Sequence, residues 1–236
     1  MLARTLVAVL AALAFQGAGP SAIRRPRDPW VFRGTIAGVD RAVTVALDAS
    51  LWTAYDTEMC SLRLAWRGDF GGEARAAQSG ARWLEGAAGG VWWLVRDGQA
   101  RALEPVWRGY AFRGQQATLR YELRHEEVRV SIEETPEFVR PADLADDPSS
   151  LAPWVMRDMV GLRRTFRASG IPDGATVTLA LSEKLQGNLL SVDLADPIDR
   201  PLEGGAERRV AARMPLRGSE AWNELVYFFG RGSGRR

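Results

Sequence analysis

Ala117-Thr-Leu-Arg-Tyr-Glu-Leu-Arg124 is the stretch that decides the fold of this chain. Its apolar side chains alternate with charged ones, so the segment reads as a strand with one buried face and one wet face. Gly109–Arg113 precedes it across a Gly-Gln-Gln turn, and Val128–Thr135 follows it with the same alternation. Consecutive alternating segments joined by short turns predict an antiparallel meander.

The same pattern extends over most of the chain. Short segments rich in β-branched and aromatic residues recur at close spacing, which is typical of a sandwich or barrel and not of βαβ units. We therefore predict an all-β antiparallel β-sandwich, jelly-roll or supersandwich-like, with long Gly/Pro-rich loops and at most one or two short helices. Residues 136–153 are expected to be a loop, and Ser149 or Ser150 could cap a short helix that ends at Met159. Further strands are expected at 31–36, 42–48, 51–55, 61–66, 91–95, 102–107, 161–168, 175–181, 189–194, 210–216 and 221–229.

The N-terminus has the pattern of a secretion signal. Arg4 precedes the apolar run 5–15, which is followed by small and turn-prone residues to position 22. The run is too short to cross a bilayer, which needs about 20 residues, and no cysteine follows it, so a lipoprotein anchor is not expected. We predict a Sec-type signal peptide at 1–22, a single β-sandwich domain at 23–229 and a disordered basic tail at 230–236. The mature chain is then periplasmic or secreted, without a membrane span; the alternative is a buried N-terminal helix.

Charge and cysteine content narrow the possible functions. The chain has 31 basic and 29 acidic residues, and they are interspersed. A nucleic-acid partner is therefore not expected, because such proteins concentrate basic residues on one face. The single cysteine, Cys60, rules out an intramolecular disulfide, a haem attachment motif and a cysteine-pair zinc site. We predict no cofactor, and Cys60 is either a buried inert thiol or a reactive one.

The tryptophans suggest a sugar ligand. Nine in one chain is a high number, and β-sandwiches that bind sugars stack exposed aromatic rings on the apolar C–H face of a pyranose. The alternative for each ring is packing in the core. Trp92 and Trp93 are adjacent in a strand and so point to opposite faces. The candidate ligand-binding residues are Trp52, Tyr55, Trp66, Trp92 and Trp93.

The candidates for catalysis are weaker. Asp56, Glu58 and His125 could supply the carboxylates or the base of a carbohydrate-active enzyme. The alternatives are that Asp56 caps a turn, that Glu58 is solvated and that His125 is an exposed turn residue. One histidine without a second ligand is a poor metal site, so no metal is predicted. Arg163 and Arg164 either clamp a carboxylate or lie on the wet face of their strand.

A series of short motifs resembles a known module. It is similar to the β-rich module of large secreted bacterial proteins that typically carry a c-type cytochrome domain and are linked to sugar oxidation. The resemblance implies no catalytic residues, since the module has no established activity. The chain lacks the haem motif, so any electron transfer would involve a partner. The motifs are Asp28-Pro-Trp-Val-Phe-Arg33, Leu51-Trp-Thr-Ala-Tyr-Asp56, Leu64-Ala-Trp-Arg-Gly68, Trp107-Arg-Gly-Tyr110, Glu134-Thr-Pro136 and Leu162-Arg-Arg-Thr-Phe166.

Together these features favour a secreted or periplasmic, non-catalytic binding module. Its expected ligand is a carbohydrate, or a partner protein in sugar oxidation or cell-surface redox chemistry. The alternatives are a hydrolase, lyase or epimerase that uses carboxylates near Asp56 and Glu58, and a structural accessory subunit. The sequence thus predicts the architecture in detail and the function only as a class.

Overall fold

The computed structural model describes residues 29–36, 39–67, 91–147, 150–153, 155–181, 189–191 and 213–229. The predicted signal peptide and C-terminal tail lie outside these residues. Within them the fold is mostly β, with antiparallel sheets and one short helix, α2 (Pro141–Leu144). No helix in this part of the chain is long and apolar enough to cross a membrane.

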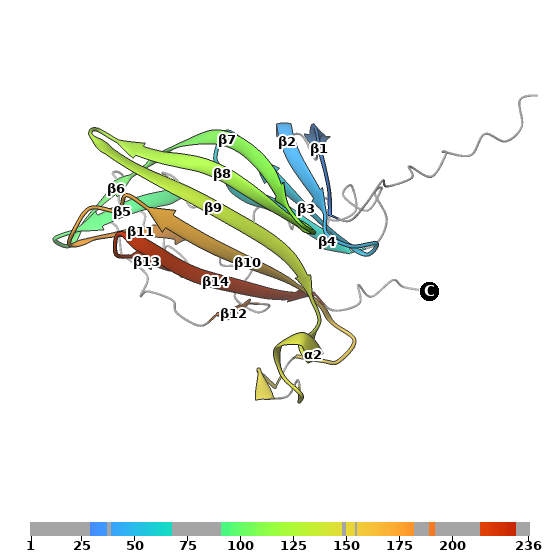
Figure 1. Cartoon of the computed structure of the whole chain (residues 1–236). Helices are drawn as coiled ribbons and strands as arrows, with labels where there is room; N and C mark the ends of the chain where they lie inside the picture. The colour runs from blue at the N-terminus through green and yellow to red at the C-terminus, as the bar shows by residue number, and fades with distance from the viewer. Residues whose placement is uncertain are drawn as a thin grey trace, which may run out of the picture.

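A six-stranded sheet runs the length of the molecule in the order β12-β14-β10-β9-β8-β7 (Figure 1). Residues 117–124 lie in β8, and β7, β8 and β9 form the predicted meander. The chain then returns through β10 and β14 on the far side of β9. The strands are β7 (Glu104–Arg113), β8 (Gln116–His125), β9 (Val128–Val139), β10 (Val160–Ser169), β12 (Leu189–Ser191) and β14 (Glu220–Phe229).

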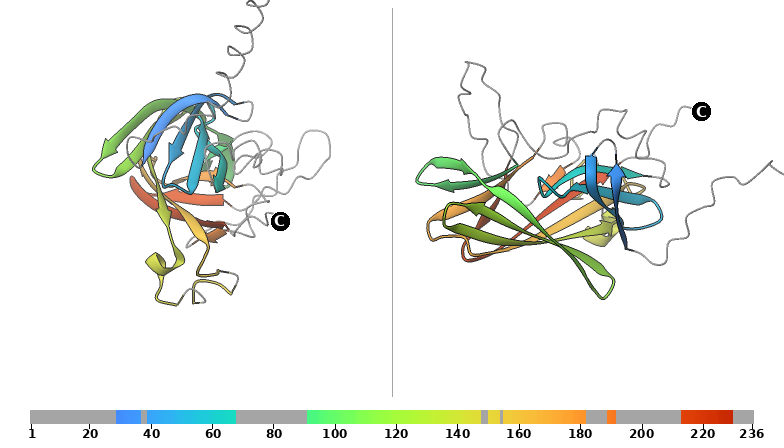
Figure 2. Two further views of the ribbon diagram at one scale, coloured as in Figure 1. Left: turned by 90° about the vertical axis from the view of Figure 1, so that its right-hand side faces the viewer. Right: turned by 90° about the horizontal axis from the view of Figure 1, so that it is seen from above.

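Two four-stranded sheets cover one face of the six-stranded sheet, each over a different end (Figures 1 and 2). The first has the order β1-β2-β3-β4 and the other the order β13-β11-β5-β6. One hydrophobic core cluster contains buried side chains from all of these sheets. The strands are β1 (Trp30–Ile36), β2 (Val39–Ala46), β3 (Leu51–Asp56), β4 (Ser61–Arg67), β5 (Trp92–Arg96), β6 (Gln99–Ala102), β11 (Ala175–Ala180) and β13 (Arg213–Arg217).

The predicted all-β sandwich is confirmed, and two local expectations are wrong. The loop expected from Pro136 begins later, because β9 continues to Val139. Pro136 has no N–H to donate, and it is accommodated because the ladder between β8 and β9 stops at Leu119↔Glu134, before the proline is reached. The helix expected to end at Met159 does not occur in the described residues; α2 lies earlier and has Pro141 in its first turn.

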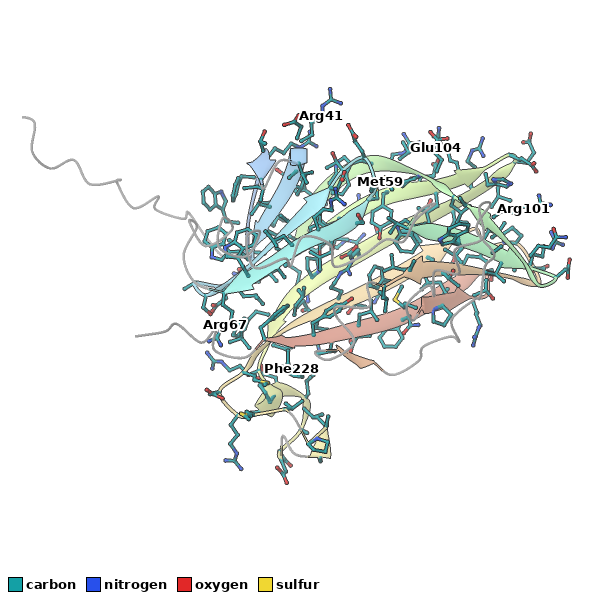
Figure 3. The ribbon with its side chains drawn as sticks, turned by 180° about the vertical axis from the view of Figure 1, so that it is seen from behind. Arg41, Met59, Arg67, Arg101, Glu104 and Phe228 are labelled. Carbon is teal, nitrogen blue, oxygen red and sulfur yellow. The ribbon has the colours of Figure 1, made fainter. Side chains whose placement is uncertain are left out.

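The segment after β9 covers one end of the outer face of the six-stranded sheet. Val139, Val226 and Phe228 form a small apolar cluster there with Val155 from this segment (Figure 3 labels Phe228). Gly161 makes the close packing possible, because a Cβ at this position would lie 2.8 Å from the Phe228 ring. The rest of the outer face lies beyond this cluster and carries mostly polar side chains.

The inner face contains an ion pair. Arg164 Nε on β10 and Glu134 Oε1 on β9 are 2.6 Å apart, and both side chains are 0% exposed. The Tyr121 hydroxyl on β8 donates a hydrogen bond of 3.1 Å to the other oxygen of Glu134. A buried arginine and glutamate at this distance compensate the desolvation that each charge would suffer alone.

Aromatic rings from all three sheets surround this pair. The Arg164 guanidinium lies 4.8 Å from the Phe166 ring centre and 5.7 Å from the Tyr55 ring centre on β3. Trp92 on β5 packs 5.7 Å from Tyr121 and 6.2 Å from Phe166, and its indole N–H donates to the Cys60 carbonyl oxygen. The buried pair therefore lies where the three sheets meet.

Arg164→Met is expected to lower the free energy of unfolding by about 3–5 kcal/mol, because it leaves the Glu134 charge buried without its partner. Replacing the whole polar group, in Arg164→Met/Glu134→Leu/Tyr121→Phe, should restore most of that loss. Urea denaturation followed by tryptophan fluorescence measures both values.

Arg163→Met is the matched control, because Arg163 lies one residue away and pairs with Glu137 on the outer face. A surface pair contributes only about 0–1 kcal/mol. If Arg163→Met and Arg164→Met were equally destabilising, the structural role assigned to the buried pair would be wrong.

Candidate functional site

The five aromatic residues expected to bind a ligand are all buried. Trp52, Tyr55, Trp66, Trp92 and Trp93 are between 0 and 3% exposed. Trp52 stacks on Trp66 with ring centres 6.1 Å apart, on the side of the first sheet that faces away from the six-stranded sheet. Tyr55 and Trp92 belong to the main core. The structure thus places them in the alternative role, core packing.

The two candidate carboxylates lie in the turn between β3 and β4. Asp56 Oδ1 accepts hydrogen bonds from the backbone N–H groups of Glu58 (2.8 Å) and Met59 (3.1 Å). Asp56 Oδ2 lies 3.4 Å from Arg63 Nε. Asp56 is buried, whereas Glu58 is exposed at the edge of a recess. Asp56 therefore closes the turn, which is the alternative role predicted for it.

His125 ends β8, at the hairpin to β9. It lines a recess together with Asp97 and Glu126, and its Nε2 is 3.8 Å from Glu126 Oε1. The recess that Glu58 lines is a different one, so the structure does not bring Glu58 and His125 into one cleft. In the part of the chain that the structure describes, no cluster of three or more His, Cys, Asp or Glu side chains could hold a metal ion.

Cys60 lies in the same turn as Asp56 and is buried. Burial raises the pKa of its thiol far above the ordinary value, and the negative charges of Glu134 and Asp56 raise it further. The Sγ atom lies 3.6 Å from the Thr57 carbonyl oxygen. A thiol in this setting stays protonated near neutral pH and is a poor nucleophile.

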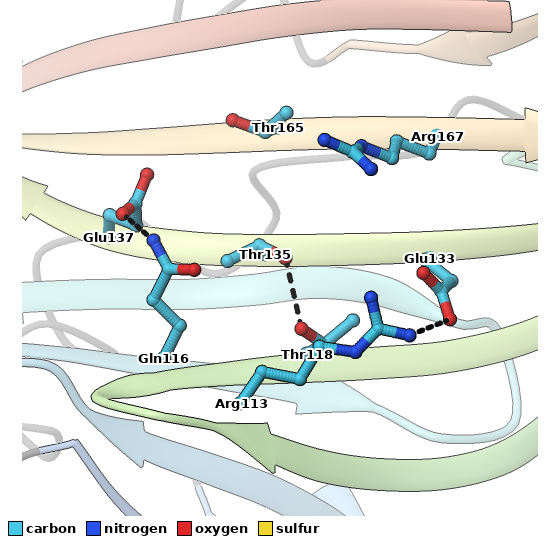
Figure 4. Close-up of a pocket in the computed structure, with 8 residues that line it drawn as sticks. All are labelled: Arg113, Gln116, Thr118, Glu133, Thr135, Glu137, Thr165 and Arg167. Carbon is cyan, nitrogen blue, oxygen red and sulfur yellow. Dashed lines mark hydrogen bonds and ion pairs between the residues drawn. The ribbon is translucent and has the colours of Figure 1, made fainter.

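The outer face of the six-stranded sheet contains an open polar recess of about 230 Å³ (Figure 4). Thr118, Thr135 and Thr165 form its floor as a row across β8, β9 and β10, and the first two hydroxyls are 3.2 Å apart. Gln116, on the rim, donates a hydrogen bond to Glu137. Such a surface offers many donors and acceptors within a short distance.

Ion pairs hold most of the charged groups on this face. Glu133 Oε1 lies 3.3 Å from Arg113 and 3.1 Å from Arg120. Glu137 lies 2.9 Å from Arg163, which also approaches Glu224 at 3.9 Å. These carboxylates are already partners of guanidinium groups.

Arg167 and Trp222 differ from the rest of the face. Arg167 lines the recess and is exposed, and its side chain has no hydrogen bond or ion pair to any other residue that the structure describes. Trp222 is its direct cross-strand partner on β14 and is 59% exposed. An indole ring and a guanidinium therefore stand side by side, open to solvent, at one edge of the recess.

Sequence reasoning missed Trp222, although its strand carries a usable signal. Ala221, Leu225 and Tyr227 share one parity and are buried, whereas Trp222 shares the other parity with Glu220 and Glu224. The alternation rule therefore places this tryptophan on the wet face. Its neighbour Arg167 was missed because an exposed arginine on a strand is common.

Comparison with protein-family models, curated proteins and solved structures gives no significant match for this chain.

Cys60 is expected to be protected from thiol reagents in the folded protein, because burial keeps it protonated and inaccessible. At pH 8, an aromatic disulfide reagent should modify Cys60 at least about a hundredfold more slowly in the folded protein than in the urea-unfolded protein. In the unfolded chain the thiol has its ordinary pKa near 8.5 and reacts readily. Absorbance of the released thiolate reports the rate. Equal rates in both states would show that the thiol is reactive.

Proposed function

We propose that this chain is a non-catalytic binding module for a carbohydrate, exported to the periplasm or the cell exterior. The observation that carries this proposal is the exposed Trp222 side chain beside Arg167, whose guanidinium has no ion pair among the described residues, at the edge of the polar recess. The surrounding face belongs to one continuous sheet, so the site is held rigid by strand pairing.

The chemistry of a sugar fits this pair of side chains. One face of a pyranose ring consists of C–H groups and packs on an indole, which combines a large apolar surface with a single N–H. The ring edge carries hydroxyl groups, which accept hydrogen bonds from Arg167. The same groups can donate to, or accept from, the hydroxyls of Thr165 and Thr135. A ligand that binds Arg167 breaks no ion pair between this side chain and another residue in the described ranges.

The carboxylates of the outer face support binding over hydrolysis. A glycosidase places two carboxyl groups on either side of the scissile bond, about 5–5.5 Å or 6.5–9.5 Å apart, and one must donate a proton. Glu133 and Glu137 instead accept contacts from arginines. A partner protein is the competing ligand, because exposed Trp and Arg are also enriched at protein interfaces.

Trp222→Ala and Arg167→Ala should each weaken sugar binding by at least about tenfold, equivalent to ~1.4 kcal/mol, because each removes one of the two open contacts. The measurement is a thermal-shift screen of the mature protein against neutral and acidic oligosaccharides, followed by isothermal titration calorimetry on each hit.

Tyr110→Ala is the matched control: Tyr110 is also an exposed aromatic residue, and it packs against Phe112 away from the recess. It should leave the affinity unchanged. The carbohydrate proposal fails if no neutral sugar in the screen raises the melting temperature, or if Trp222→Ala binds every neutral hit as tightly as the wild type. If no sugar binds and a protein is captured through Trp222, the ligand is a partner protein.

A further inference from the structure

The recess that Glu58 lines lies between the first sheet and β7, apart from the polar recess of the outer face. It has a volume of about 610 Å³ and is lined by Arg33 and Thr35 of β1, Arg41 of β2, Thr57 and Glu58 of the β3–β4 turn, and Trp107 of β7. Figure 3 shows Arg41 at the end of the first sheet. Met59 of the β3–β4 turn lies between that sheet and β7. The recess is thus the mouth of the space between two sheets.

The strands around this mouth carry all three register shifts of the described ladders. One lies between Gly34 and Ile36, one between Ala54 and Tyr55, and one between Trp107 and Gly109. A β-bulge interrupts pairing and redirects the side chains next to it, and bulges are enriched beside functional sites. The shift in β7 changes which of its side chains point inward. Trp107 lies on the inner side of the six-stranded sheet and faces the recess.

Arg41 is held in an uncommon backbone conformation at this mouth. Its φ of 57° lies in the left-handed region, although it is not a glycine and belongs to a strand. The Thr57 hydroxyl donates a hydrogen bond of 3.0 Å to the Arg41 carbonyl oxygen and so fixes this conformation. Residues held in sparsely populated conformations cluster at ligand sites.

The charges at the mouth leave two cations available. Arg33 and Arg41 are both exposed, and neither has an ion pair with a residue in the described ranges. Glu58 is the acidic side chain that lines the recess with them. Asp40, beside Arg41, accepts a hydrogen bond of 3.1 Å from the Thr35 hydroxyl. The guanidinium groups therefore present donors in a planar fork that matches the geometry of an oxyanion.

We propose that this recess binds an oxyanion carried on a saccharide, such as the carboxylate of a uronic acid or a sulfate ester. The volume is that of a small-molecule site and far exceeds what a free ion needs. Trp107 supplies an apolar wall for the sugar ring. Both threonine hydroxyls already donate to protein oxygens and keep free lone pairs for sugar hydroxyls, and Glu58 accepts from another. This site does not depend on the Trp222 site.

Calorimetric titration of the mature full chain with trigalacturonate and with its uncharged methyl ester tests the proposal. The acid should bind at least about tenfold more tightly than the ester, and raising the salt concentration should weaken its binding. Arg33→Gln/Arg41→Gln should remove at least about tenfold of the affinity for the acid, because charge-assisted hydrogen bonds are lost. A sulfated trisaccharide that binds more tightly than trigalacturonate, with the same dependence on Arg33 and Arg41, would identify the oxyanion as a sulfate ester.

Arg129→Gln/Arg157→Gln is the matched control, because it removes the same charge from exposed positions that do not line the recess. It should bind the acid like the wild type, and Trp222→Ala should do so as well, which separates this site from the outer face. Equal affinities for the acid and its ester would overturn the proposal, as would equal losses in the two double variants. Inorganic sulfate that binds as tightly as the trisaccharides would overturn the assignment to a saccharide.

Discussion

The ion pair between Arg164 and Glu134 is the constraint on which the arrangement of the sheets depends. Two opposite charges with no exposure to water are tolerated only when each is the partner of the other. The residues that enclose them come from different sheets: Tyr55 from the first, Trp92 from the third and Tyr121 from the largest. A shift of any sheet would separate the charges or admit water. Tyr55, Glu134 and Arg164 belong to three short motifs of the sequence, at 51–56, 134–136 and 162–166, which therefore meet in the core.

Packed side chains fill the inside of the molecule, and the proposed binding sites lie on its outside. The buried tryptophans fill the space between and behind the sheets, and the outer face of the six-stranded sheet keeps its polar side chains and Trp222 open. Where the first sheet meets β7, the packing opens into a recess with two arginines. The proposed carbohydrate contacts therefore lie on surfaces that strand pairing holds in place. Binding of a ligand to them requires no movement of a core residue.

The sequence predicts most strands, because period-two alternation is strong wherever one face of a strand is buried. The same alternation places Arg164 on the buried face of its strand, with Leu162 and Phe166. It places Glu134 on the buried face with Ile132. The partnership of the two charges was not predictable, since it depends on the register between β9 and β10 and on the sheets above them. For the same reason the binding candidates chosen from sequence, Trp52 and Trp92 among them, could not be distinguished from core residues, and the recess at Arg33 and Arg41 depends on bulges that no local pattern reveals.

The most direct test of the central claim, that an open indole on the outer face binds the ligand and the buried indoles do not, is a saccharide titration followed by the indole N–H resonances in ¹⁵N-labelled mature protein. The account predicts that the Trp222 resonance, assigned with Trp222→Phe, shifts in proportion to occupancy, while the resonances of Trp52, Trp66, Trp92 and Trp93 stay in place. A titration in which the buried indoles shift and Trp222 does not would contradict it.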